Sequence, residues 1–477
     1  MDQEHPRQDS QSVVVPRRAV RTAIELGSSV RMMAHTVAPQ HRLKLDFGFN
    51  LEAVALTLYI FRDAFGGVAR YYTSILHVGA LWFLPDVVAM LCIGLFVQRC
   101  IIRNRSIVAA LVLLQIVLSL GIGYFFLGTI NALSSSFKMM LPVFVGFSFC
   151  DSNFGSYKKL LMIFTGVFYA SIIGVFLSKY TTMPWTGFKY ESFGAVREAG
   201  RLWWAAAEQR LSGFAADNTM AAFFILITFV VTSIRKSTLW CLIFGSIAVY
   251  AIKLTTSKTT MLVLLLYMVL LLVVRSLPER MKFTAVRRIA LWSFASIFAP
   301  LVLILLASGA SVGNKDLLFS MMDRINNSWQ LPFVYMSELM PVGFITGCGA
   351  GCFNYPQQLF SNLVSYWVPV DNFYLGTYLM FGLPFVVFMW MVFRTTFLVT
   401  DIYKLSLIFT VNLFTITVLN YGPSTGLLMI ALSFSEVFSR RASVALQVPS
   451  RRPDLGRASL SEEERSAIGA SVPRPAS

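Results

Sequence analysis

The sequence predicts an all-α, polytopic integral membrane protein with about twelve transmembrane helices. Long apolar runs alternate along the chain with short clusters of Arg and Lys. These runs approach the ~17–25 residues that a membrane-spanning helix needs, and they lack the alternation typical of barrel strands. The composition agrees, because 56% of the residues are hydrophobic and only 13% are charged, about half the charged share of a soluble domain.

The formal net charge of +16 could indicate a nucleic-acid partner, but the location of the charge argues against one. The cations lie at the termini and between apolar runs, for example within 99–105, 158–159 and 235–236. Basic clusters between helices mark cytoplasmic loops by the positive-inside rule. We therefore expect no nucleic-acid binding, and we place both termini in the cytoplasm.

Three regions are expected in chain order. Residues 1–44 are rich in Arg, Gln and Ser, and without an apolar core they are predicted to form a disordered cytoplasmic tail, not a signal peptide. Residues 439–477 are predicted to form a second disordered cytoplasmic tail that touches anionic lipid headgroups. The membrane domain between them, 45–438, is expected to have spans near 45–62, 77–98, 107–128, 137–150, 160–177, 216–234, 238–253, 259–275, 289–308, 371–393, 396–418 and 423–438.

Two longer polar stretches interrupt this pattern, residues 178–215 and 309–370, and on this topology both face the extracytoplasmic side. They carry Arg and Lys on the side that the positive-inside rule depletes, which suggests an anionic ligand. Long loops also cross the membrane regardless of charge. Lys179, Lys189 and Lys315 are assigned to that background.

A series of residues at loop ends and helix starts carries the functional signal. They are Arg210, Gly213 and Asn218; Ser257 and Lys258; Arg324; Gly347, Gly349, Gly351 and Phe353; and Asp371, Asn372 and Tyr374. In this order they resemble the Wzy-type polysaccharide polymerases and the related O-antigen ligases, over about residues 205–384. Ligases of this family typically carry His where this chain has Asp371, and neither long loop contains a His, which favours the polymerase.

The resemblance implies a metal-independent glycosyltransferase without a cofactor. Such an enzyme polymerises polyprenyl-pyrophosphate-linked oligosaccharide repeat units into a bacterial surface or secreted polysaccharide, at the outer face of the inner membrane. The implied partners are the lipid-linked oligosaccharide, membrane lipid, a chain-length regulator and a flippase. A ligase that transfers glycan from the carrier to another acceptor is one alternative. A non-enzymatic flippase or exporter is another, but it is expected to line a central cavity with charges inside many spans.

The resemblance also implies roles for the charged residues. Arg210 and Arg324 suit the leaving pyrophosphate, because a guanidinium pairs two phosphate oxygens and stays charged. Lys258 supplies charge without that fork. Asp371 is the candidate general base for the acceptor hydroxyl, and its alternative role is an ordinary helix N-cap. His77, at the outer end of a predicted span, is a distant second candidate.

The remaining motif residues are expected to bind substrate: Gly213, Asn218, Gly347, Gly349, Gly351, Asn372 and Tyr374. The three glycines of 347–351 lack the Lys-Ser/Thr of a phosphate loop, so they predict a tight turn that approaches either substrate or a helix. Cys348 and Cys352 flank this turn. A disulfide is chemically allowed in an extracytoplasmic loop, but so short a closure is geometrically demanding, and the sequence leaves it open.

Overall fold

The structure is a computed structural model, and it describes residues 50–192, 195–201, 203–205, 208–307, 319–417 and 423–447. The tail predicted at 1–44, residues 448–477 of the second tail, and Lys315 lie outside the described residues. Residues 440–447, which were expected to belong to that second tail, form a helix. The described chain is helical apart from four short strands, in agreement with the expected all-α class.

The elements of the first half are α2 (Leu51–Ala64), α3 (Gly66–Ile75), η1 (Gly79–Phe83), α4 (Leu84–Phe96), η2 (Val97–Arg103), α5 (Ile107–Leu127), α6 (Ile130–Phe147), η3 (Phe154–Ser156), α7 (Lys158–Tyr180), β1 (Lys189–Ser192), β2 (Ala195–Glu198), β3 (Trp203–Ala205), β4 (Glu208–Arg210), α8 (Asn218–Ser233) and α9 (Thr238–Leu254). Those of the second half are α10 (Lys258–Ser276), α11 (Glu279–Trp292), η4 (Ser293–Phe298), α12 (Ala299–Ala307), α13 (Phe319–Asp323), η5 (Arg324–Gln330), α14 (Leu331–Leu339), α15 (Gly343–Thr346), α16 (Tyr355–Phe360), η6 (Val364–Tyr366), α17 (Phe373–Phe381), α18 (Leu383–Thr396), α19 (Ile402–Phe414), α20 (Ser424–Phe434), η7 (Ser435–Phe438) and α21 (Arg440–Gln447).

Among the described residues, six helical segments are long and apolar enough to cross a membrane: Gly79–Arg103, Ile107–Leu127, Ile130–Phe147, Lys158–Tyr180, Lys258–Ser276 and Glu279–Leu306. Large apolar side chains such as Leu111, Phe125 and Leu262 point outward from them, as expected for surfaces that face lipid. Shorter apolar helices occupy 218–233, 238–254, 383–396, 402–414 and 424–438. The transmembrane character is therefore confirmed, whereas the number of about twelve spans stays a prediction.

Several expected spans differ in the structure; the one expected at 289–308, for example, belongs to a helical segment that begins at Glu279. The span expected over 371–393 is divided into α17 and α18 at Gly382, whose φ of 63° and ψ of −147° leave the helical region. Pro384 then occupies the first turn of α18, where a missing N–H costs nothing. The span expected at 137–150 is longer and begins at Ile130, because Asn131 and Ser134–Ser136 are part of α6 despite their polarity.

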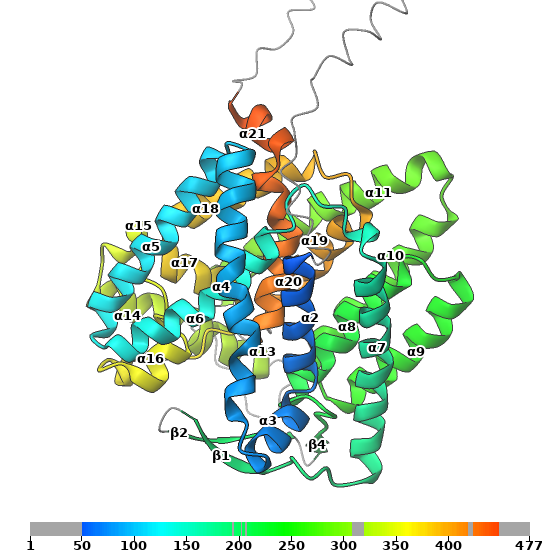
Figure 1. Ribbon diagram of the computed structural model, residues 1–477, viewed down its shortest axis with the longest axis horizontal. Coiled ribbons are helices and arrows are strands. Elements are labelled where there is room, and N and C mark those ends of the chain that lie inside the picture. The colour runs from blue at the N-terminus through cyan, green and yellow to red at the C-terminus, as the bar shows by residue number, and fades with distance from the viewer. Residues whose placement is uncertain are drawn as a thin grey trace, which may run out of the picture. The chain divides into compact units, whose positions relative to one another are not determined.

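Helix α20 lies at the centre of the helices and packs against α6, α2 and α19 (Figure 1). Its residues from Thr425 to Phe434 are all buried. Gly146 of α6 allows the closest approach, because a Cβ there would overlap the carbonyl oxygen of Leu428. Small residues at a helix crossing let the two backbones meet, which is a common packing device in membrane proteins.

The two ends of this helical region carry different features. At one end, Arg99 pairs with Glu52 at 2.8 Å, and Lys404 pairs with Glu436 at 3.0 Å. Helix α21 lies at this end (Figure 1). At the opposite end lie α3 and the antiparallel hairpins β1–β2 and β3–β4, which fall within the first long loop (Figure 1). No pattern in the sequence predicts these hairpins.

Candidate functional site

Hydrogen bonds connect several of the helix ends that carry the motif residues. Asn218, at the start of α8, donates its side-chain N–H to the carbonyl oxygen of Thr255 at 3.0 Å, after the end of α9. The Asn372 side chain, before α17, donates to the carbonyl oxygen of Ile416 at 2.7 Å. Thr417 and Thr259 join their hydroxyls at 2.8 Å, which connects that segment to the start of α10 and therefore to Lys258. The fold thus gathers segments that are up to about 200 residues apart in the sequence.

Arg324 and Asp371 form an ion pair in this region, with 3.8 Å between Arg324 Nε and Asp371 Oδ2. Their side chains are 29% and 44% exposed, so both are accessible to a substrate. Partial burial raises the pKa of the Asp371 carboxyl above its ordinary value, Arg324 opposes that rise, and Asp323 adds to it. Asp371 is therefore a stronger base than a fully solvated aspartate.

The N-cap of α17 is Asn372, not Asp371. The Asn372 side-chain oxygen accepts a hydrogen bond from the backbone N–H of Leu375 at 2.9 Å, which is the standard capping contact. Asp371 precedes the cap, and among the described residues its side chain is paired with Arg324 and not with the backbone of the helix. The structural role that competed with catalysis at Asp371 therefore belongs to its neighbour.

Arg210 ends strand β4 and faces a small polar cavity of about 150 Å³ that Arg201 and Lys179 also line. Its Nε is buried and has no hydrogen-bond partner among the described residues. The next residue, Leu211, donates its backbone N–H to the carbonyl oxygen of Leu254 at 3.4 Å, so β4 is tied to the end of α9. The structure gives no direct contact between Arg210 and Arg324.

The other motif residues of this region lie inside the protein. Asn218, Asn372 and Tyr374 are 6%, 0% and 3% exposed, and the Tyr374 hydroxyl donates to the side chain of Asn412. Gly213 packs on α7, where a Cβ would lie 2.9 Å from the backbone of Gly174. These residues hold the site together, while Arg210, Lys258, Arg324 and Asp371 are the ones with accessible side chains.

The glycine turn approaches helices. Gly347, Gly349 and Gly351 all have positive φ, and added Cβ atoms would overlap Met380, Gly123 and Ser136, which belong to α17, α5 and α6. Cys348 and Cys352 are joined by a disulfide. Of the two alternatives for this turn, contact with helices is the one that the structure shows.

Gly349→Ala is expected to destabilise the protein. Its φ of +94° disfavours any side chain, and the new methyl group would overlap the backbone nitrogen of Gly123. A left-handed residue alone costs about 1–3 kcal/mol, and the overlap adds to this. Gly121→Ala is the matched control, because its Cβ would point into open space. Thermal unfolding in detergent should show a lower midpoint for Gly349→Ala only, and equal midpoints would contradict the packing role.

A second polar site was missed in the sequence. A cavity of about 530 Å³ lies between α2, α3, α6, β2, α16 and the start of α20, and its charged lining residues are Arg62, Asp63, Arg70, Lys138 and Arg197. Arg62 pairs with Asp63 and Asp86, each at 3.0 Å. Ionisable residues inside apolar segments are themselves a signal of function in membrane proteins, and that signal could have revealed this cavity.

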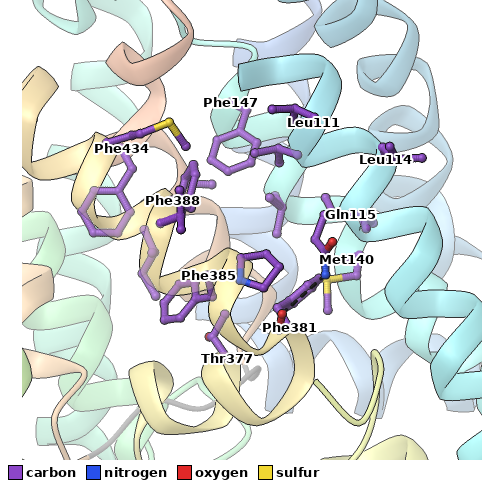
Figure 2. A pocket seen from close by; sticks show the side chains of 18 of the residues that line it. Leu111, Leu114, Gln115, Met140, Phe147, Thr377, Phe381, Phe385, Phe388 and Phe434 are labelled. Atoms are coloured by element: carbon purple, nitrogen blue, oxygen red, sulfur yellow. Dashed lines mark hydrogen bonds between the residues drawn. The ribbon is translucent and has the colours of Figure 1, made fainter. Parts of the chain in front are cut away.

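An apolar pocket of about 490 Å³ lies between α5, α6, α17, α18 and α20 (Figure 2). Phe381, Phe385, Phe388 and Phe434 line it, and the Gln115 side chain donates to the carbonyl oxygen of Phe381 at 3.4 Å (Figure 2). Phe373 also lines the pocket, only two residues after Asp371. One residue of the pocket lining is therefore a close sequence neighbour of Asp371.

No model of a known protein family matches the chain, and no match to a curated protein was found. The resemblance to the polysaccharide polymerases thus depends on the motif residues alone. Among the residues that the structure describes, no group of three or more His, Cys, Asp or Glu side chains is placed to hold a metal ion.

Proposed function

We propose that the protein is a membrane glycosyltransferase that polymerises polyprenyl-pyrophosphate-linked oligosaccharide units at the outer face of the bacterial inner membrane. The observation that carries this proposal is the accessible Arg324–Asp371 pair, in which the carboxylate is not used as a helix cap. The helix starts at Asn218 and Lys258 converge on the same region. This arrangement offers a base and a cation to one substrate.

Asp371 accepts the proton of the acceptor hydroxyl as the oxygen attacks the anomeric carbon. Arg324 stabilises the negative charge that develops on the departing pyrophosphate. The two roles assist each other, because Arg324 lowers the pKa of Asp371 in the empty site. When Arg324 turns to the pyrophosphate, the carboxylate loses that partner and becomes a stronger base.

The surroundings of the pair suit a lipid-linked substrate. The apolar pocket of Figure 2 begins at Phe373 and can take part of an isoprenoid chain, which needs an apolar environment. The disulfide between Cys348 and Cys352 lies in the second long loop, and disulfides persist in oxidising compartments outside the cytoplasm. The pocket thus supports a lipid-linked substrate, and the disulfide supports a reaction at the outer face.

One observation favours a second candidate, a flippase for lipid-linked saccharides. The polar cavity holds Arg62, Asp63 and Lys138 on helices, where the sequence analysis expected no such cavity. Charges that line a cavity within the membrane region are expected of a flippase. A flippase has no use for a general base, however, and the base at Asp371 is the feature that favours the enzyme.

Deletion of the gene tests the proposal. We expect the surface glycan of the deletion strain to consist of single repeat units, and long chains to return with the wild-type gene but not with an Asp371→Asn gene. Long carrier-bound chains that are not attached to their acceptor would identify a ligase instead. Accumulation of lipid-linked units at the inner face would identify a flippase. Unchanged glycan would overturn the proposal.

A further inference from the structure

The polar cavity next to the Arg324–Asp371 region carries more positive than negative charge. Four cations line it, Arg62, Arg70, Lys138 and Arg197, whereas Asp63 and Asp86 are the carboxylates in contact with them, which leaves an excess of two positive charges. We infer that this cavity binds the diphosphate group of a second lipid-linked saccharide, the acceptor of the polymerisation reaction.

The carboxylates of Asp63 and Asp86 already have cationic partners at the floor of the cavity. Arg62 bridges Asp63 and Asp86 at 3.0 Å each and donates to the Ser424 hydroxyl at 2.6 Å. Lys138 lies 3.5 Å from the other oxygen of Asp86. These contacts hold the floor rigid, so a ligand does not have to order it.

Arg70 and Arg197 supply the excess charge. The Arg70 guanidinium lies over the Trp82 ring at 3.7 Å and over the Tyr190 ring at 4.7 Å. Neither Arg70 nor Arg197 has an ion-pair partner within the described part of the chain. Aromatic rings orient a guanidinium without neutralising it. Burial, reinforced by Arg197 and Arg62, lowers the pKa of Arg70 to about 10, so the group stays charged at neutral pH and an anion would relieve this cost.

The size and charge of the cavity match a diphosphate that joins a lipid to a sugar. Each phosphate of such a diester carries one negative charge at neutral pH, and the pair matches the excess in the cavity. The volume of about 530 Å³ exceeds what one phosphate needs and leaves room for the first sugar. Ser134, Ser135 and Asn131 offer hydroxyl and amide groups at the wall for that sugar.

A series of hydrogen bonds that passes the start of α8 connects the cavity lining with the segment that precedes α17. Ala216 and Met220 line the cavity, and Asn218 between them bonds to Thr255 beside the start of α10. Two anion sites on either side of one helix start would place two lipid carriers next to each other. Polymerisation needs that arrangement, because donor and acceptor are both carrier-linked; the assignment to the acceptor therefore rests on the proposed function.

The test measures binding to the full-length protein in detergent, by native mass spectrometry with geranylgeranyl diphosphate as the probe. We expect two bound molecules per chain for the wild type. Arg70→Ala and Arg197→Ala should each weaken binding at the cavity site by about tenfold or more, so that one strong site is lost. Arg280→Ala, which removes an exposed cation from α11, is the matched control. Arg197→Gln on strand β2 serves if Arg70→Ala does not fold.

Comparison of probes identifies the source of the anion. Weak competition by inorganic pyrophosphate would support a lipid-linked diphosphate as the ligand. Equal binding of geranylgeraniol to the wild type and the variants would overturn the inference. Equal affinity of wild type and the Arg70→Ala, Arg197→Ala double variant for geranylgeranyl diphosphate would also overturn it. Arg324→Ala should keep the cavity site. If polymer is normal in the deletion strain, the proposed function fails while this binding result stands on its own.

Discussion

Arg324→Ala is expected to abolish long polymer while the protein stays at normal abundance in the membrane. The side chain is 29% exposed and its one described ion pair is with Asp371, so its removal leaves no buried charge uncompensated. Loss of one charge-assisted contact to a leaving group lowers the rate by about 10²–10³. Polymer length on gels, with immunoblots of membranes for abundance, measures the effect.

Two further variants sharpen this result. Arg324→Lys should recover polymer only in part, because an ammonium keeps the charge but loses the two-pronged contact. Arg288→Ala removes an exposed cation from α11 and should leave polymer unchanged. Polymer of wild-type length in Arg324→Ala cells, at matched abundance, would remove Arg324 from the site.

Asp371→Asn is expected to be as inactive as Asp371→Ala, with a loss of about 10²–10⁴ in rate. Asn has the size of Asp but cannot take a proton from the acceptor hydroxyl. The start of α17 should be unaffected, because Asn372 provides the cap. Asn372→Ala is the contrasting variant, since loss of a cap lowers the free energy of unfolding by about 1 kcal/mol without removing the base. Normal polymer in Asp371→Asn cells would leave the base unidentified.

The pH dependence gives an independent signature of the same base. Protonated Asp371 cannot accept a proton, so activity falls as the pH drops through its pKa. Partial burial raises that pKa, so the acid limb should lie at higher pH than for an ordinary aspartate. The residual activity of Arg324→Ala should show a limb at still higher pH, because the cation that lowers the pKa is gone. A limb that does not move between wild type and Arg324→Ala would contradict the pairing.

Hydropathy predicted the uninterrupted helices well. The spans expected at 107–128 and 160–177 correspond to Ile107–Leu127 and Lys158–Tyr180. It could not predict the break at Gly382, because a single glycine and a proline hardly change the mean hydropathy of an apolar run. The hairpins of the first long loop were missed for a different reason. Their pairing depends on contacts with the rest of the fold, and their short strands show no clear alternation.

The motif residues predict one region of the candidate site, but they do not show which residue has which structural role. The sequence alone does not distinguish Asp371 from Asn372 as the N-cap of α17, since either residue type can be a cap. In the structure Asn372 is the cap and Asp371 stays accessible. Isolated charges such as Arg62 and Asp86 were absorbed into expected spans or span ends. Ser424, which accepts a hydrogen bond from Arg62, lies 362 residues away from it, and no local pattern connects residues so distant.

That separation affects how the protein is made. Arg62 and Asp63 are made early in synthesis, but Ser424 and Thr425, which accept a hydrogen bond from Arg62 and donate hydrogen bonds to Asp63 respectively, emerge from the ribosome only near the end. Until α20 arrives, the carboxylate of Asp63 lacks its bonds to the Thr425 backbone and hydroxyl, each 2.8 Å long. Nascent chains that stop before α20 therefore keep only the Arg62 partner of this carboxylate, and we expect them to be less stable and more susceptible to proteolysis than the full chain.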